Sequence, residues 1–226
     1  MIFDYRTLAT QIRRSLFRTR GTNRRLTAAR LRFFAIFSVL FLYCQLSSWI
    51  GLALDHILYP SFRKIDTRSK TVFIVGNFRS GSTFLHRMLA ADRKTFTALN
   101  TWEIYLAPSI VQRKFFRGVK IVDSWFGSPV YRRLRAWDGA FLQSVKLHSI
   151  SLWKPEEDAG LLLYVWYGLF SWFFFPDWEP IEKIVRFDRM IPRSRRRRVA
   201  RFYAGCLKRH LYVHGHDRII VSKNPS

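Results

Sequence analysis

The stretch from Thr71 to Asp92, TVFIVGNFRSGSTFLHRMLAAD, constrains the fold of this chain more than any other. Residues 71–75 are β-branched or aromatic and predict a buried strand. Apolar residues at 84, 85, 88, 89 and 91 predict one face of a helix. The glycine-containing loop between them would therefore lead into a helix N-terminus. Free N–H groups and the helix dipole make such a place favourable for a phosphate-like anion.

The loop itself supplies further groups for an anion. Arg79 can add a guanidinium fork, and the serine and threonine hydroxyls can donate hydrogen bonds. The spacing nearly fits the nucleotide-binding pattern G-x-x-x-x-G-K-[ST], but Ser82 replaces the lysine that reaches the terminal phosphates of a nucleoside triphosphate. An ordinary glycine-serine turn remains the alternative. The predicted binding residues are Gly76, Asn77, Phe78, Arg79, Ser80, Gly81, Ser82 and Thr83.

The RSGST core of this loop, followed by Leu-His-Arg at 85–87, resembles the 5′-phosphosulfate loop of sulfotransferases. These enzymes take a sulfuryl group from 3′-phosphoadenosine 5′-phosphosulfate. The resemblance implies an α/β fold with a central parallel sheet, nucleotide-kinase-like in outline. It also implies a reaction that needs no metal, because the loop and a lysine supply the positive charge.

A carboxylate follows the expected second strand, near 96–99. In a parallel sheet, ligands gather at the carboxyl ends of the strands, so Glu103 could face the anion loop. Equally, Glu103 could cap a helix that begins near Thr101. In the tyrosylprotein and heparan sulfotransferases a glutamate in similar placement acts as general base, and the run 99–110 is more like bacterial membrane-associated sulfotransferases. The resemblance therefore implies that Glu103 takes the proton of the acceptor.

The segment 217–226 predicts a short buried strand and the turn after it, with Lys223 at the carboxyl end of the strand. An ordinary turn lysine is one reading. In the tyrosylprotein and heparan sulfotransferases a similar strand–Lys–x–Pro motif carries a catalytic lysine. The resemblance therefore implies that Lys223 stabilises charge on the sulfuryl group and the leaving phosphate. The family's later 3′-phosphate-binding motif is not found, so we expect the sulfotransferase core, 59–226, to be incomplete at its C-terminal end.

The run 148–158, HSISLWKPEED, combines a histidine with acids. Proline followed by acids is typical of a helix start, which here would fall at Pro155. The run also resembles the same bacterial sulfotransferases, which suggests that His148 and Glu157 line the acceptor site. Adjacent acids point in different directions on a helix, so we expect no metal site. The acceptor, a hydroxyl or an amine, is of unknown class.

The N-terminal part, 1–58, predicts a basic arm and a hydrophobic membrane-associated helix. Residues 1–32 carry nine arginines and one aspartate, with apolar residues at helical spacing, which is typical of a helix on anionic lipid. Residues 33–54 carry no charge, and at about 1.5 Å per residue they could cross the roughly 30 Å hydrocarbon core. A buried or interfacial helix is the alternative. The positive-inside rule places the arginine arm in the cytoplasm. A donor made in the cytosol favours a core on the cytoplasmic face of the inner membrane, with a Golgi lumen as the other layout.

The formal net charge of +24 points to anionic partners. We interpret the basic stretches at 111–145 and 193–198 as solvated or lipid-facing surfaces, and expect no specific nucleic acid. The apolar run 159–176 predicts a core helix or a helix that dips into the membrane interface. Two rivals to the sulfotransferase hypothesis stay open. One is a P-loop kinase or nucleotide triphosphatase, and the other is a non-enzymatic basic protein that binds membrane or nucleic acid.

Overall fold

The computed structural model describes residues 3–17, 27–77, 80–142, 151–169, 171–175 and 178–223. Its contacts divide the chain into two compact units. The first contains Met1–Ser47 and Ala159–Ala204, and the second contains Ser48–Asp158 and Gly205–Ser226. Helices α2 (Ala28–Leu58) and α10 (Arg193–His214) contribute residues to both. The sequence boundary expected after residue 58 stays a prediction.

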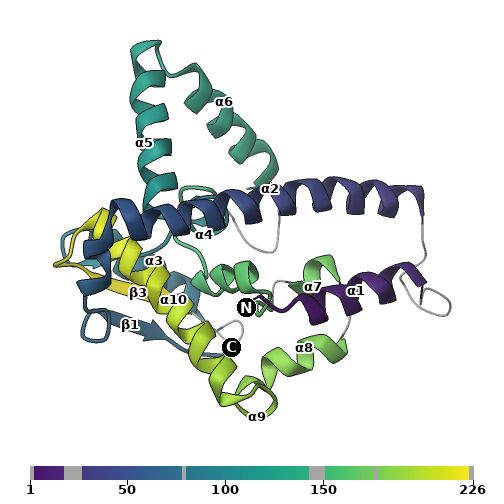
Figure 1. Ribbon diagram of the computed structural model, residues 1–226. Helices are drawn as coiled ribbons and strands as arrows, with labels where there is room; N and C mark the ends of the chain where they lie inside the picture. The colour runs from purple at the N-terminus through teal and green to yellow at the C-terminus, as the bar shows by residue number, and fades with distance from the viewer. Residues whose placement is uncertain are drawn as a thin grey trace. The chain divides into compact units, whose positions relative to one another are not determined.

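A parallel sheet lies in the second unit (Figure 1). It contains β1 (Thr71–Ile74), β3 (Ile219–Lys223) and β2 (Phe96–Thr97), in that order across the sheet. Both pairings are parallel, and Ile74 lies opposite Lys223. The predicted α/β fold with a central parallel sheet is therefore confirmed. Because β1 and β3 are neighbours in register, their carboxyl ends meet at one edge of the sheet.

Short helices follow the strands of the second unit. Helix α3 begins one residue after Gly81, whose φ of 80° is left-handed and suits glycine. The core beneath the sheet is apolar, and Leu99, Ile104 and Ile220 are each 1 % exposed or less. The remaining helices of this unit are a 3₁₀ helix at Pro60–Lys64, α3 (Ser82–Ala91), α4 (Thr101–Tyr105), α5 (Ile110–Trp125), α6 (Pro129–Trp137) and a π-helical turn at Asp138–Leu142.

Helices α5 and α6 form a hairpin that rises from the second unit (Figure 1). The carboxylate of Asp55 accepts hydrogen bonds from the N–H groups of Ile110 and Val111, each at 3.0 Å, and so caps α5. At the turn, the carboxylate of Asp123 accepts from the N–H groups of Val130 and Tyr131 at 3.0 and 2.9 Å, and so caps α6. Both ends of the hairpin are therefore fixed by buried aspartates.

The first unit is helical among its described residues and is held by aromatic packing. Phe3, Trp166 and Phe175 are buried together, and phenylalanines of α2 pack against them. Burying several aromatic side chains in one place supplies a large apolar area. The elements of this unit are α1 (Tyr5–Phe17), the first part of α2, a 3₁₀ helix at Asp158–Val165, α7 (Ser171–Phe174), α8 (Trp178–Val185), α9 (Phe187–Met190) and the first part of α10.

Helix α2 is long and apolar enough to cross a membrane by length and composition. One face packs inside the first unit, where the ring of Phe37 lies 4.4 Å from that of Phe174 and the side chain of Gln45 donates to the carbonyl of Tyr164 at 2.7 Å. The other face is apolar yet exposed, as Ile36, Val39, Leu40, Tyr43 and Leu46 show. An apolar face turned to solvent along a helix favours membrane association.

The structure differs from the sequence prediction between residues 155 and 176. Pro155 does not begin a helix but forms an antiparallel bridge with Asn100, and the Glu156 N–H donates to the Leu99 carbonyl at 3.1 Å. Backbone groups beyond β2 need partners, and this extended segment supplies them. The predicted core helix over 159–176 is interrupted at Trp166, whose φ of 61° is left-handed.

Candidate functional site

The anion loop connects β1 to α3 as predicted. Its residues 76, 77 and 80–83 are described, whereas Phe78 and Arg79 lie outside the described residues. A Cβ on Gly76 would come within 2.9 Å of the Ser80 hydroxyl oxygen, so glycine keeps this turn open. The first N–H groups of α3 have no partner within the helix, so they are available to an anion at its start.

Lys223 joins the loop to the acidic segment. Its Nζ donates to the Thr83 hydroxyl at 2.7 Å and to Oε1 of Glu157 at 2.7 Å. The Lys223 side chain is 5 % exposed and that of Glu157 is 21 % exposed. Three residues predicted from different parts of the sequence are therefore in contact at the carboxyl edge of the sheet. His148, the other predicted acceptor residue, lies outside the described residues.

The position of Glu157 follows from the extended segment before it. The bridge at Pro155 brings the chain alongside the sheet. The hydroxyl of Ser222 then donates to the carboxylate of Asp158 at 3.1 Å. Glu157 and Asp158 thus contact Lys223 and Ser222, which are consecutive residues of β3. Sequence reasoning placed Glu157 near the site by resemblance, but its contact with Lys223 depends on a bridge that no local pattern encodes.

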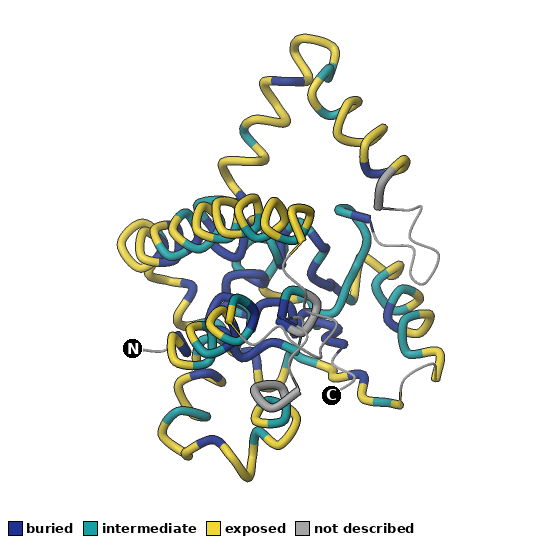
Figure 2. Tube along the Cα trace, turned by 90° about the vertical axis from the view of Figure 1, so that its right-hand side faces the viewer, coloured by how far each residue is buried: buried dark blue, intermediate teal, exposed yellow. Residues whose placement is uncertain are grey.

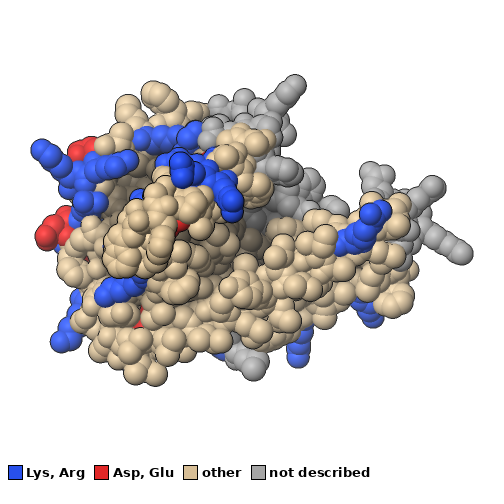
Figure 3. All heavy atoms as spheres, turned by 90° about the horizontal axis from the view of Figure 1, so that it is seen from above, with Lys and Arg blue, Asp and Glu red and all other residues tan. Residues whose placement is uncertain are grey.

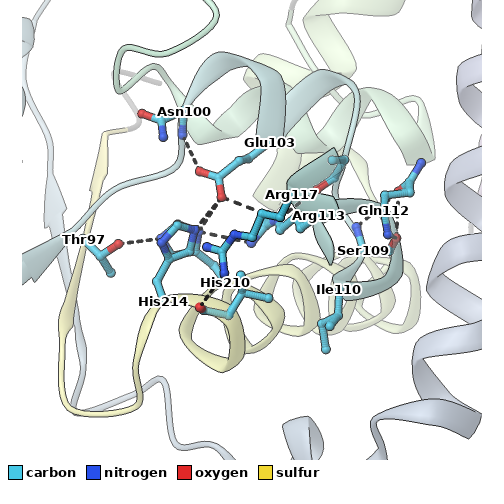
Figure 4. Close-up of polar contacts among 12 residues, drawn as sticks. Thr97, Asn100, Glu103, Ser109, Ile110, Gln112, Arg113, Arg117, His210 and His214 are labelled. Carbon is cyan, nitrogen blue, oxygen red and sulfur yellow. Dashed lines mark hydrogen bonds and ion pairs between the residues drawn. The ribbon is translucent and has the colours of Figure 1, made fainter. Parts of the chain in front are cut away.

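Glu103 lies in a different set of contacts (Figure 4). Its Oε2 accepts from the Asn100 N–H at 3.0 Å, at the start of α4, and its Oε1 lies 2.6 Å from Nε2 of His214 on α10. The Arg113 Nε and the His210 Nδ1 are 3.7 and 3.8 Å from the same oxygen. The carboxylate is fully buried. Of the two roles left open by the sequence, the helix cap is the one the structure displays.

The charge of Glu103 is fixed by its neighbours. Burial by itself would raise its pKa, but the charge of Arg113 and the hydrogen bond with His214 lower the pKa well below the usual range. A carboxylate held by several donors and shielded from solvent is poorly placed to take a proton from an acceptor. Its role as general base therefore stays a prediction, and the structure supplies no contact between Glu103 and Lys223 among the described residues.

The tautomer of His210 follows from its partners. Arg113 can only donate, and its Nη1 lies 3.2 Å from Nδ1 of His210, so that ring nitrogen accepts. The protonated Nε2 then donates to the Thr97 hydroxyl at 2.8 Å. Burial lowers the pKa of His210 well below its ordinary value, which keeps the ring neutral.

Glu103, His210 and His214 could in principle hold a metal ion, since their ligand atoms lie within 4.8 Å of one another. Sequence reasoning missed this cluster, although the histidines form an H-x-x-x-H pattern on α10. The guanidinium of Arg113 contacts both His210 and Glu103. A resident cation beside the ligand atoms repels a second one, so these residues are better suited to Arg113 than to a metal.

Comparison with known proteins supports the sulfotransferase resemblance. No curated protein and no solved structure matches the chain. A profile described as the sulfotransferase family matches residues 71–149. This range begins at the first residue of β1 and includes the anion loop, α3, β2 and Glu103. Residues 71–149 of this chain are thus similar to the sulfotransferase family, and the match ends before Lys223.

Proposed function

We propose that this protein transfers a sulfuryl group from 3′-phosphoadenosine 5′-phosphosulfate to a hydroxyl or amine acceptor. The observation that carries the proposal is the contact of Lys223 with Thr83, at the point where the anion loop enters α3. The family match supports a transferase of this kind. The donor and the roles of individual residues are the further content of the proposal.

The loop would hold the 5′-phosphosulfate. Its contributors are the N–H groups at the start of α3, the hydroxyls of Ser80, Ser82 and Thr83, and the side chain of Arg79. Lys223 would move from its present partners to the oxygens of the transferring group, where fixed positive charge stabilises the transition state. The proposal uses no metal, since these groups supply the positive charge themselves.

The reaction is a displacement at sulfur. The acceptor oxygen or nitrogen forms a bond to sulfur while the bond from sulfur to the phosphate oxygen breaks, which releases 3′-phosphoadenosine 5′-phosphate. The acceptor's proton must pass to a base. Resemblance points to Glu103, whereas geometry points to Glu157, which contacts Lys223 and is partly exposed. We propose Glu157 as the base and Glu103 as the residue that fixes α4 and α10, with Glu103 as the rival base.

A transfer assay tests this function. Donor carrying radiolabelled sulfate is incubated with the protein and with a sugar, a glycolipid, a tyrosine peptide or a small alcohol. We expect label on at least one acceptor, and its loss in Lys223→Ala. Label transfer that Lys223→Ala leaves intact would contradict the assigned site. Transfer of the terminal phosphate of ATP with magnesium would instead favour the kinase alternative.

We also propose that membrane lipid is the partner of the exposed face of α2. Ile36, Leu40 and Tyr43 on that face support it. A cytoplasmic core is favoured by a donor made in the cytosol, with a Golgi lumen as the alternative. Protease added to sealed spheroplasts should spare the second unit. Its digestion there would contradict the cytoplasmic placement.

A further inference from the structure

The α5–α6 hairpin (110–137) exposes apolar side chains at helical spacing. On α5, Phe115, Val119 and Val122 follow helical spacing and are 64, 41 and 46 % exposed. The end of α5 adds Trp125 and the turn adds Phe126, each 74 % exposed. Figure 2 shows that most of both helices is exposed. An apolar stripe along a projecting helix, ending in two large aromatic side chains, is unlike an ordinary solvated surface.

The second helix repeats this arrangement. Val130 and Leu134 lie one turn apart on α6 and are 50 and 45 % exposed. Both helices thus present apolar side chains toward solvent, and they do so on either side of the turn that carries Trp125 and Phe126. The hairpin ends in an apolar tip rather than in the polar residues usual for an exposed turn.

The same hairpin is strongly basic. Asp123 is the only acidic residue in the sequence 110–137, and its carboxylate is used to cap α6. The face seen in Figure 3 carries many lysine and arginine side chains and few acidic ones. Exposed cations beside exposed apolar side chains complement a surface that is anionic outside and apolar beneath. The exposed cations of the hairpin are Lys114, Arg117, Lys120, Arg132, Arg133 and Arg135.

The hairpin is also pre-formed. Its base is anchored by Asp55, which caps α5 and pairs with Arg209 at 2.7 Å. Arg113 is fully buried there, and its Nε donates to the Ala107 carbonyl at 2.8 Å. Its turn is fixed by Asp123. A binding element that needs no further ordering loses little conformational entropy when it docks.

We propose that the α5–α6 hairpin inserts its Trp125–Phe126 tip into an anionic lipid surface, with its lysines and arginines on the headgroup phosphates. Trp and Phe favour the boundary between headgroups and acyl chains, and long basic side chains reach from that depth back to the phosphates. The proposal stands without sulfuryl transfer, because lipid insertion requires neither donor nor acceptor.

A local probe separates this contact from any contribution of α2. The full chain carries an environment-sensitive fluorophore at Val130→Cys, beside the tip, in a Cys44→Ala background. Cys206 can remain, because it is fully buried and burial raises its pKa to about 11. The matched control carries the fluorophore at Lys94→Cys, on an exposed turn of the same unit. Vesicles contain phosphatidylcholine alone or with phosphatidylglycerol, and brominated acyl chains serve as quencher.

With phosphatidylglycerol present, we expect the fluorophore at 130 to shift to the blue and to be quenched, and the fluorophore at 94 to do neither. Added salt should reduce the shift. An aqueous environment at 130 in vesicle-bound protein, or equal quenching at 130 and 94, would overturn the proposal. A blue shift that depends on protein concentration and needs no vesicles would overturn it in favour of a second copy as the partner.

A variant pair tests the tip itself. Trp125→Gln with Phe126→Gln should reduce quenching at 130 about tenfold, because the variant lacks the two large aromatic side chains whose transfer from water into lipid favours insertion. Both side chains are mostly exposed, so the fold should be kept, which circular dichroism can check. Val185→Gln with Met190→Gln removes two exposed apolar side chains from the first unit and should leave quenching unchanged. Equal quenching in the two pairs would contradict insertion of the tip.

Discussion

Two glutamates near the sheet offer a direct test of which carboxylate serves the chemistry. Glu103→Gln and Glu157→Gln make the same change, from carboxylate to amide. Glu103 is fully buried beside Arg113, which is also fully buried. Glu157 is partly exposed and contacts Lys223. We expect the first substitution mainly to lower stability and the second mainly to lower activity.

The magnitudes follow from burial. Removing one partner of a buried ion pair leaves the other charge uncompensated and costs about 3–5 kcal/mol. For a chain of this size that lowers the melting temperature by about 6–20 °C. Glu157→Gln leaves Lys223 with the Thr83 hydroxyl as partner, so it should cost about 1–2 kcal/mol. Loss of a general base lowers the rate by roughly 10²- to 10⁴-fold.

Differential scanning calorimetry and the sulfate-transfer assay, run on both variants under conditions where each is folded, give the two readouts. We expect an unstable Glu103→Gln that retains transfer per folded molecule, and a stable Glu157→Gln that has lost transfer. A Glu103→Gln protein with normal stability and a rate reduced at least a hundredfold would refute the assignment and make Glu103 the base.

Three further outcomes can be checked. Lys223→Ala should lower kcat by about 10²-fold or more, and Lys223→Arg should restore part of it, as transfer kinetics would show. Acidification from pH 7 to 5 should lower the melting temperature, because burial lowers the pKa of His210 and His86 below 6.5, so that only the unfolded chain takes up the protons. His210→Gln should make the melting temperature depend less on pH. An unchanged slope in this variant would contradict the prediction. Gly51→Ala should lower the free energy of unfolding by about 1–3 kcal/mol in chemical denaturation, because the added Cβ would clash with the Ser109 hydroxyl oxygen. The control, Gly118→Ala, has open space around it and should not destabilise the protein.

Much of the sheet could be predicted because its signals are local. Residues 71–75 predict a buried strand by composition. The strand is found at Thr71–Ile74, but the prediction of burial is wrong for Val72 and Phe73, which are exposed. The helix predicted over 84–91 is α3, and the strand that ends at Lys223 is β3. The meeting of Lys223 with the loop also followed from the sequence, since carboxyl ends of parallel strands share one edge.

What could not be predicted depends on partners far away in the chain. The position of Glu103 after β2 was correct, but the direction of its side chain is set by His214 and Arg113, which no local pattern connects to it. Pro155 followed by acids is typical of a helix start, yet the segment is extended because Asn100 pairs with it. Long-range contacts override local preference in both cases.

The most direct test of the central claim is calorimetric binding of 3′-phosphoadenosine 5′-phosphate, compared with ATP and magnesium, to the full chain in detergent. We expect the bisphosphate to bind more tightly than ATP with magnesium and Lys223→Ala to weaken the binding of the bisphosphate. Tighter binding of ATP with magnesium, or bisphosphate binding that is indifferent to Lys223, would contradict the sulfotransferase site proposed for this protein.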